Sequence, residues 1–355
     1  MQVQKIRVLV VDDDRTVRRM LAAGLQQDPT IEVVGEATDP YNARDKIVEL
    51  QPDVMTLDVE MPRMNGLDFL RRLMPQYPLA VIMVSSLTEE GRYVTLESLK
   101  AGALDFVAKP GGSGGDFESM ILDLRQKVQM AARVDIKEFV KTHLTDSKPF
   151  ARERAQGSGI SLIVVGASTG GTQAFSYILE RLPENTPGIL VVQHMAPGFT
   201  GTYANTLNKH TLLEVKEAET LDLIMPGRVL VAPGNQHMAV KEEGNSMRVN
   251  LFEYEKVNGH RPSVDVTFNS VAESSAASSA IGVLLTGMGK DGARGLLSLR
   301  RAGARTIAQD EKSSIVYGMP QAARELDAVE QELSLEEIPG AIMNLLESHR
   351  PGAPR

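Results

Sequence analysis

The sequence has 355 residues, no cysteine and a formal net charge of -8 at pH 7. A chain of this length exceeds one typical domain, so we expect two hydrophobic cores. The lack of cysteine excludes disulfides, a thiolate zinc site and a cysteine nucleophile. The acidic balance argues against a nucleic-acid partner, since phosphate binding needs a concentrated basic face. No signal-peptide or membrane-spanning pattern is present, so we expect a cytoplasmic protein.

The first third of the chain alternates short apolar runs with amphipathic stretches. This pattern predicts a flavodoxin-like α/β domain with a doubly wound, five-stranded parallel sheet. The expected strands are residues 6–11, 31–36, 54–57, 80–84 and 105–107. We place this domain at residues 1–124. A helical and flexible linker is expected at residues 125–159, because a helical pattern from Asp116 to about Leu144 is followed by a stretch without apolar periodicity.

The remainder, residues 160–355, repeats this kind of pattern and predicts a second doubly wound α/β domain. Its expected strands are residues 161–165, 188–192, 228–231, 281–285 and 305–308. Between the third and fourth of them, residues 238–240 and 247–252 flank the sequence Glu-Glu-Gly-Asn. We expect these two segments to form a hairpin inserted at the edge of the sheet.

Polar side chains follow four of the strands in the first domain. They are Asp12, Asp13, Asp58, Ser85 and Lys109. The carboxyl ends of parallel strands meet at one edge of a sheet, so these side chains should converge. Crowded carboxylates repel one another unless a hard cation lies among them, and Mg²⁺ prefers oxygen ligands. The set therefore predicts magnesium-assisted phosphoryl transfer to Asp58, although any single Asp here could simply be a solvated loop residue.

In these positions the chain resembles the receiver domain of two-component response regulators. The resemblance rests on Val11-Asp12-Asp13, Asp58 followed by Met-Pro and Met-Asn-Gly, Ser85, and Phe106 ahead of Lys109-Pro110. It implies that Asp58 is phosphorylated by a histidine kinase and that Asp12, Asp13, Asp58 and the main-chain carbonyl of Glu60 hold Mg²⁺. It also implies that Ser85, Phe106 and Lys109 respond to the phosphoryl group. Asp14 replaces the serine that is common after the paired aspartates.

The second domain opens with Gly-Ala-Ser-Thr-Gly-Gly, residues 166–171, directly after its first expected strand. The spacing matches a nucleophile elbow, in which small neighbours allow a tight strand-to-helix turn that exposes the Ser168 hydroxyl. The helix start would add N–H groups for an oxyanion. A phosphate-binding or purely structural turn is the alternative. A dinucleotide site is disfavoured because the spacing is not Gly-x-Gly-x-x-Gly.

A serine nucleophile needs a base and an acid that orients the base. His194 and His237 both lie near expected strand ends, and spacing alone does not choose between them. Asp291 and Asp310 are the candidate acids. Asp291 is preferred because the glycines around it allow close backbone approach. The order Ser, His, Asp differs from that of α/β-hydrolases, which indicates a different hydrolase fold.

Five motifs then resemble the chemotaxis-receptor methylesterases of the CheB family. In chain order they are Gly-Ala-Ser-Thr-Gly-Gly, Val-Val-Gln-His-Met, Val-Ala-Pro-Gly, Arg-Pro-Ser-Val-Asp and Leu-Leu-Thr-Gly-Met-Gly-x-Asp-Gly. The resemblance implies Ser168 as nucleophile, His194 as general base and Asp291 as the orienting acid. It further implies an oxyanion hole formed by the main-chain N–H groups of Thr169 and Met288. Lys290 stands where we expect asparagine.

The resemblance also implies the substrates, which are glutamyl methyl esters on chemoreceptors, and deamidation of some receptor glutamines. No cofactor is expected for the hydrolase, and contact with the membrane would be peripheral, through the receptors. We expect the unphosphorylated receiver domain to block the Ser168 cleft and phosphorylation at Asp58 to relieve the block. The alternative is a response regulator whose output domain binds a partner without catalysis, and a general acyl hydrolase is a further possibility.

Overall fold

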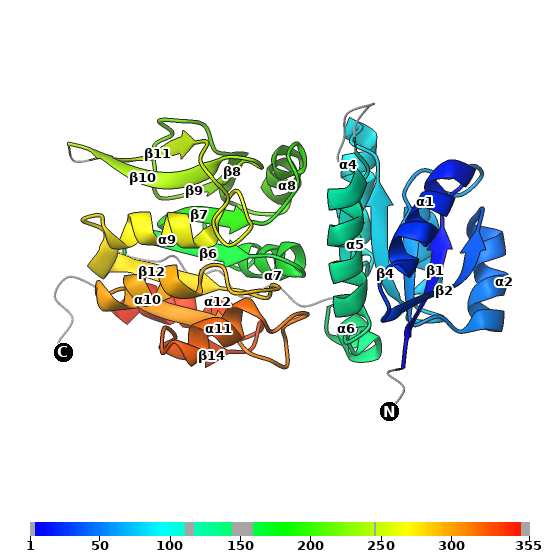
Figure 1. Ribbon diagram of the computed structural model, residues 1–355. Coiled ribbons are helices and arrows are strands. Elements are labelled where there is room, and N and C mark those ends of the chain that lie inside the picture. Colours follow the sequence, from blue (N-terminus) through cyan, green and yellow to red (C-terminus); the bar gives the residue numbers. More distant parts are fainter. Residues whose placement is uncertain (1–3, 111–116, 144–158, 245, 349–355) are drawn as a thin grey trace. The chain divides into compact units, whose positions relative to one another are not determined.

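The computed structural model describes residues 4–110, 117–143, 159–244 and 246–348. The chain divides into two compact units, Met1–Asp146 and Ser147–Arg355, which run from blue to teal and from green to red in Figure 1. The predicted flexible tether, residues 145–159, lies outside the described residues except at its last position. None of the described helices combines the length and apolar character needed to cross a bilayer.

The first unit contains the predicted five-stranded parallel sheet, in the order β2-β1-β3-β4-β5. Strands β3 and β4 bury every residue, as expected for a parallel sheet covered by helices on both faces. The strands are β1 (Ile6–Val11), β2 (Ile31–Ala37), β3 (Val54–Asp58), β4 (Ala80–Ser85) and β5 (Asp105–Ala108). The helices are α1 (Arg15–Gln26), α2 (Pro40–Leu50), α3 (Gly66–Leu73), α4 (Glu89–Lys100), α5 (Phe117–Ala131) and α6 (Ile136–His143).

Side-chain caps fix where the helices of this unit begin. The Asp14 carboxylate accepts hydrogen bonds from the N–H groups of Thr16 and Val17, at 2.7 and 3.0 Å, at the start of α1. Asp39, Asn65 and Thr88 cap α2, α3 and α4 in the same way. Aspartate and serine are both good N-cap residues, so Asp14 can fill the place of the more common serine without disturbing the helix.

The single helical pattern that we predicted from Asp116 to Leu144 is two helices, α5 and α6. Asp135 separates them, because its carboxylate accepts hydrogen bonds from the N–H groups of Lys137 and Glu138 and so caps α6. Helix α5 continues to Ala131, beyond the expected end of the domain at residue 124. The side chain of Val128 is fully buried within this continuation. The limits 1–124, 125–159 and 160–355 stay predictions, but α5 packs on the first unit over its whole length.

We expect Val128→Ala to destabilise the first unit by about 1–3 kcal/mol, because it leaves a cavity under α5. The exposed neighbour Gln126 supplies the control, and Gln126→Ala should change the free energy of unfolding by less than about 0.5 kcal/mol. Urea unfolding of the full chain measures both. Equal stability of the two variants would mean that α5 beyond residue 124 behaves as a linker.

The second unit contains a seven-stranded parallel sheet in the order β14-β13-β12-β6-β7-β9-β8. The strands are β6 (Leu162–Ala167), β7 (Gly188–Gln193), β8 (Glu214–Glu217), β9 (Arg228–Val231), β12 (Ala280–Leu284), β13 (Arg305–Gln309) and β14 (Gln331–Leu333). The helices are α7 (Gly171–Leu179), α8 (Phe199–Asn208), α9 (Val264–Ala272), α10 (Ala293–Arg301), α11 (Met319–Glu325) and α12 (Ile338–Ser348), with a 3-10 turn at Ala277–Ser279. The five predicted strands are confirmed.

The two edge strands, β8 and β14, were missed. They are short and polar, with the sequences Glu-Val-Lys-Glu and Gln-Glu-Leu. An edge strand pairs on one side only and needs no continuous apolar run, so its sequence carries little signal.

The predicted hairpin is also confirmed, as β10 (His237–Glu243) and β11 (Ser246–Phe252). The two strands form a separate antiparallel sheet and do not extend the parallel one.

The direction of winding reverses near the centre of each sheet. In the first sheet the reversal lies between β1 and β3, and in the second between β6 and β12. Loops that leave neighbouring strands at such a point diverge to opposite faces, which opens a crevice at the carboxyl ends of the strands. The fold therefore indicates one site beside Asp12 and Asp58 and another beside Ser168 and Asp291.

Candidate functional sites

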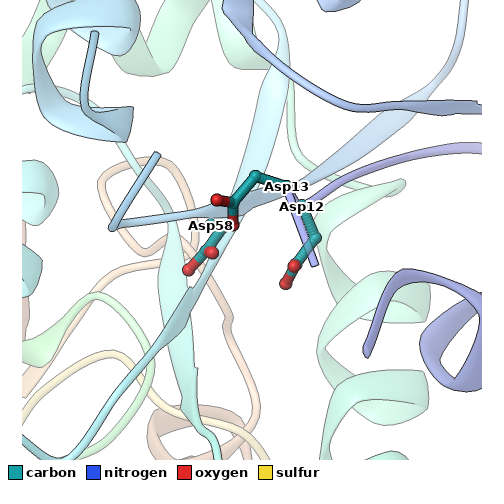
Figure 2. A group of neighbouring side chains, drawn as sticks. All are labelled: Asp12, Asp13 and Asp58. Carbon is teal, nitrogen blue, oxygen red and sulfur yellow. The ribbon is translucent and has the colours of Figure 1, made fainter. Parts of the chain in front are cut away.

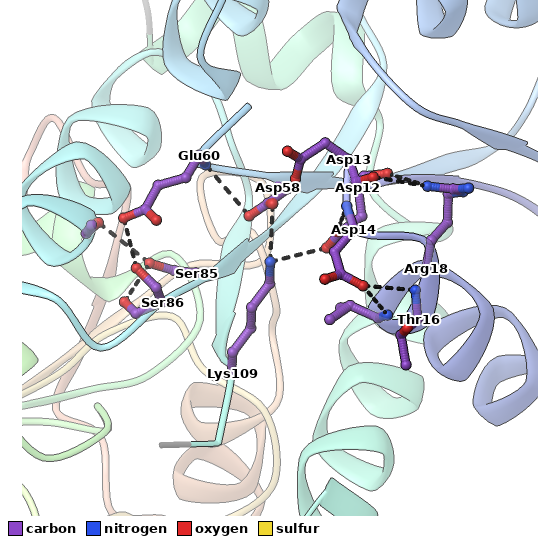
Figure 3. Close-up of polar contacts among 12 residues, drawn as sticks. Asp12, Asp13, Asp14, Thr16, Arg18, Asp58, Glu60, Ser85, Ser86 and Lys109 are labelled. Atoms are coloured by element: carbon purple, nitrogen blue, oxygen red, sulfur yellow. Dashed lines mark hydrogen bonds and ion pairs between the residues drawn. The ribbon is translucent and has the colours of Figure 1, made fainter. Parts of the chain in front are cut away.

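The first site is a cluster of three carboxylates. Asp12 follows β1, Asp13 comes next, and Asp58 is the last residue of β3 (Figure 2). One oxygen from each residue lies within 4.8 Å of the others, with Asp12 and Asp58 buried and Asp13 exposed. Lys109 is the neighbouring cation, and its Nζ lies 3.0 Å from Asp12 Oδ2 and 2.9 Å from Asp58 Oδ2 (Figure 3).

The charges in this cluster do not balance, since one ammonium faces three carboxyl groups. Burial, helped by the charge of Asp12, raises the pKa of Asp58 to about 6, although Lys109 opposes the change. Burial alone would lower the pKa of Lys109, but the two carboxylates outweigh it and raise that pKa. A set of close oxygen ligands with surplus negative charge fits a hard divalent cation such as Mg²⁺.

Of the other residues predicted for this site, Glu60 and Ser85 lie beside the β4–α4 loop (Figure 3). Glu60 is joined to Asp58 by a 3.4 Å hydrogen bond from its N–H, while its carboxylate accepts hydrogen bonds from Ser86 and Thr88. The Ser85 hydroxyl accepts a hydrogen bond from Thr95 of α4 and is directed to that helix, with no hydrogen bond to Asp58 among the described residues. Phe106 is buried on β5.

Ser168 lies in the turn between β6 and α7, where the predicted elbow is. Gly170, with a φ of +78°, turns the chain into the helix. The Ser168 N–H donates to the Thr286 carbonyl at 3.0 Å, and its carbonyl accepts from Gln193 Nε2 at 2.8 Å. A Cβ added at Gly287 would lie 2.7 Å from Ser168 Cβ. The loop after β12 can therefore pack against Ser168 only because it has glycine there.

His194 begins the loop after β7, next to Ser168. Its N–H donates to the Ala167 carbonyl at 3.0 Å, and its Nε2 lies 2.8 Å from Asp291 Oδ2. The side chain is only 7% exposed. The other ring nitrogen, Nδ1, is buried without a hydrogen-bond partner among the described residues, and none of them bonds it to the Ser168 hydroxyl.

The Asp291 carboxylate accepts hydrogen bonds from several groups besides His194. Ser263 Oγ and the N–H of Val264 donate at 2.7 Å each, and Asn258 Nδ2 donates at 2.8 Å. Burial alone would raise the pKa of Asp291, but the contacts with His194, Asn258 and Ser263 outweigh it and hold that pKa well below its usual range. The ionised Asp291 carboxylate accepts a hydrogen bond from the Nε2–H group of His194. In this tautomer Nδ1 carries the lone pair.

The alternative base and acid have other partners. His237 is fully buried on β10, where its Nδ1 accepts from the Ser263 N–H at 3.2 Å and its Nε2 lies 3.0 Å from the Glu255 carbonyl. Asp310 accepts hydrogen bonds from the N–H and hydroxyl of Ser313. Main-chain groups occupy both nitrogens of His237, so the geometry favours the pair His194 and Asp291.

The predicted oxyanion residues belong to two loops that contact each other at Ser168. Thr169 is buried ahead of α7, and its carbonyl accepts from the Thr286 hydroxyl at 3.0 Å. Met288 is partly buried in the loop after β12 that also carries Asp291. Lys290 is exposed, as expected for a solvated lysine.

Sequence reasoning missed Asn258 and His260. The His260 ring stacks on the His194 ring, with 3.8 Å between centroids and 9° between planes. Both residues belong to a loop between the hairpin and α9, just before the Arg-Pro-Ser-Val-Asp motif. The dipeptide Asn258-Gly259 is a strong turn signal, but nothing in its spacing from Ser168 indicates a contact with the site.

Comparison with known families identifies both units. A model described as CheB methylesterase matches residues 163–342, and one described as response regulator receiver domain matches residues 8–115. The chain belongs to the CheB methylesterase family. A protein of Syntrophotalea carbinolica, named protein-glutamate methylesterase/protein-glutamine glutaminase, is 50% identical over 351 residues, which cover 98% of this chain and 99% of the relative.

Other relatives agree with this assignment. A protein of Sulfurimonas denitrificans with the same name is 50% identical and covers 97% of this chain and 99% of its own. The crystal structure of the Thermotoga maritima CheB methylesterase catalytic domain is 38% identical and matches with a TM-score of 0.51. That match covers 52% of this chain and 98% of the other.

The charge imbalance around Asp58 predicts a pH-dependent stability. The pKa of Asp58 is higher in the folded protein than its ordinary 3.8, so the folded state holds the proton more tightly. The contribution of Asp58 to the free energy of unfolding is therefore lost as the pH rises from about 4 to about 6, and it is absent above that range. In metal-free buffer at pH 8 we expect Asp58→Asn to raise the free energy of unfolding by ~1–3 kcal/mol.

Urea unfolding in EDTA at pH 8 and pH 5 measures this gain, which should shrink at the lower pH. The control is Asp45→Asn, which removes an exposed carboxylate on α2 and should change stability at neither pH. A gain that is equal at both pH values would contradict the assigned charge imbalance.

Proposed function

We propose that this protein is a phosphorylation-regulated methylesterase that hydrolyses glutamyl methyl esters of chemoreceptors and deamidates receptor glutamines. The observation that carries the proposal is the buried pair of His194 and Asp291 beside Ser168 at the winding reversal of the second sheet. The names of full-length relatives at 50% identity support the substrate. The receiver domain match supports control by phosphorylation.

In the proposed reaction the Ser168 hydroxyl attacks the ester carbonyl carbon and gives its proton to His194 Nδ1. Asp291 stays ionised and stabilises the imidazolium through the Nε2 proton, in keeping with its lowered pKa. The tetrahedral oxyanion accepts hydrogen bonds from the main-chain N–H groups of Thr169 and Met288. Collapse of this intermediate returns the proton from Nδ1 to the departing oxygen and releases methanol.

Water then attacks the acyl group on Ser168, with His194 Nδ1 taking one of its protons. The acyl bond breaks, Ser168 regains a proton from His194, and the glutamic acid side chain loses its remaining proton to solvent and leaves as a carboxylate. A glutamine substrate follows the same route, except that ammonia departs in the first half. One set of residues thus serves both activities, and the hydrolytic site needs no cofactor for either.

In the receiver domain, the carboxylate of Asp58 is the proposed phosphoryl acceptor, with a histidine kinase as donor. Asp12, Asp13, Asp58 and the Glu60 carbonyl would hold Mg²⁺, which would supply positive charge to the phosphoryl oxygens. Lys109 lies 2.9 Å from Asp58 and can form an ion pair with the new phosphate. The Ser85 hydroxyl would donate to a phosphoryl oxygen in place of the main-chain carbonyls of Ser86 and Gly91, to which it donates now.

The cytoplasm is the proposed location, with receptors as the only contact to the membrane. The alternative, an output domain that binds without catalysis, offers no reason for a buried Asp291 with five donors beside a histidine whose Nδ1 has no partner among the described residues. Structural histidines such as His237 have both nitrogens bonded.

We expect Ser168→Ala and His194→Ala each to lower kcat by about 10⁴-fold or more, and Asp291→Asn by about 10²–10⁴-fold. The double variant of Ser168 and His194 should be hardly worse than either single one, because the residues act together. The measurement is methanol release from methylated receptor membranes. His237→Gln is the matched histidine control, and loss of activity there with normal activity in His194→Ala would refute the assignment.

Asp58→Asn is expected to remove both Mg²⁺-dependent phosphorylation by a small-molecule phosphodonor and the accompanying rise in methanol release. Basal esterase activity should remain, because Asp58 belongs to the first unit and Ser168 to the second. Radiolabelled acyl phosphate and methanol are measured in the same samples. Stimulation that persists in Asp58→Asn would place the phosphorylation site elsewhere.

A further inference from the structure

The loop between the hairpin and α9 contains a very tight turn, Val257–His260. The N–H of Val257 donates to the His260 carbonyl at 3.1 Å, and the N–H of His260 donates to the Val257 carbonyl at 2.9 Å. Asn258 and Gly259, the two residues between them, have φ values of +53° and +85°. Positive φ at both central positions is typical of a type I′ turn, for which Asn-Gly is the preferred sequence.

The turn is fixed to its surroundings by the residue that follows it. The Arg261 guanidinium donates to Asn235 Oδ1 at 2.6 and 3.1 Å and to the Tyr254 carbonyl at 2.6 Å. A two-residue turn closed by mutual hydrogen bonds has little freedom of its own, and this anchor holds it against the rest of the unit. Side chains on the turn can therefore position other groups accurately.

Two side chains of the turn contact the proposed catalytic pair. The His260 ring lies parallel to the His194 ring at 3.8 Å, so it limits rotation of the imidazole out of its plane. The Asn258 amide nitrogen donates to Asp291 Oδ1 at 2.8 Å and also to Asp265 Oδ2 at 2.7 Å. One turn thus touches both the proposed base and the acid that orients it.

The bridge to Asp265 explains why an amide is needed at position 258. Asp265 and Asp291 are both buried, and only a donor between them can satisfy two carboxylates at once. The N–H of Gly295 fixes the other oxygen of Asp265 at 2.7 Å. Burial, together with the charge of Asp291, raises the pKa of Asp265, as expected for carboxylates held close together.

We propose that Asn258 and His260 are positioning residues for the ester hydrolysis, acting as a two-point clamp on Asp291 and His194. The clamp is the turn Val257–His260, and its role rests on the function proposed above. It keeps the imidazole in the plane that directs Nε2 to Asp291 and leaves Nδ1 available to the Ser168 hydroxyl. A misplacement of about 1 Å at such a site can cost about 100-fold in rate.

Variants at position 260 distinguish ring stacking from other roles of His260. We expect His260→Ala to lower kcat by about 10–100-fold with KM changed less than about threefold, because the base loses its orientation while substrate binding is kept. His260→Phe restores a flat ring and should recover most of kcat. Lys256→Ala, an exposed residue of the same loop, is the control and should behave as wild type.

Variants at position 258 distinguish the hydrogen bonds of the Asn258 amide from the effect of this residue on the shape of the turn. Asn258→Asp keeps the size and the tolerance of positive φ but replaces the donor by a third carboxylate, so kcat should fall by about 100-fold. Asn258→Gly keeps the turn and removes the amide, so the loss should be about 10-fold. A residue that only shapes the turn would tolerate both changes equally well.

A spectroscopic measurement tests the clamp without any substrate. The proton between His194 Nε2 and Asp291 should give a low-field ¹H resonance, assigned by its loss in His194→Ala. We expect this resonance to shift or broaden in His260→Ala and Asn258→Asp, and to be retained in His260→Phe and Lys256→Ala.

The outcomes distinguish the clamp from the proposed function. Unchanged kcat and an unchanged resonance in His260→Ala and Asn258→Asp, with Ser168→Ala inactive, would overturn the clamp alone. Failure of His260→Phe to recover kcat or the resonance would overturn the stacking role. Wild-type protein without methanol release would refute the proposed function, and the resonance would still decide whether the clamp orients His194.

Discussion

The reversal of winding in each parallel sheet is the constraint on which both sites depend. Beside that point the loops of neighbouring strands turn to opposite faces and leave their polar ends in a shared crevice. In the first sheet the reversal brings Asp12 next to Asp58, and in the second it brings Ser168 next to the loop of Asp291. Strands β3 and β6 are buried along their whole length, so the polar side chains of the two sites lie at the ends of these strands.

The pKa of the buried carboxylate is shifted in opposite directions at the two sites. Asp58 shares one ammonium with its neighbours, and burial raises its pKa to about 6. Asp291 is buried as well, but its several donors hold its pKa well below the usual range. A site with too little positive charge attracts a cation, whereas a site with many donors keeps a permanent anion. The same residue type therefore suits reversible phosphorylation in one unit and orientation of a base in the other.

Glycine decides how closely the loops of the second site can approach. Gly287 allows the loop after β12 to contact Ser168, and a Cβ there would overlap both Ser168 and Met319. The main-chain hydrogen bond from the Ser168 N–H to the Thr286 carbonyl depends on that approach. The turn Val257–His260 adds a fourth loop to the site, and its Asn-Gly sequence suits the positive φ values that the tight turn requires.

The sequence by itself determined the two α/β units, ten of the twelve parallel strands and the polar residues at their ends, because continuous apolar runs and the loops that follow them are local signals. It also reached Ser168 through the spacing of its glycines. Spacing alone did not choose between His194 and His237, because both lie near strand ends. The family resemblance implied His194, and the tertiary structure showed that His194 contacts Asp291 whereas His237 has other partners. The contacts of Asn258 and His260 could not be predicted from the sequence either, because hydrogen bonds and ring stacking between residues far apart in the chain produce no periodic pattern in it.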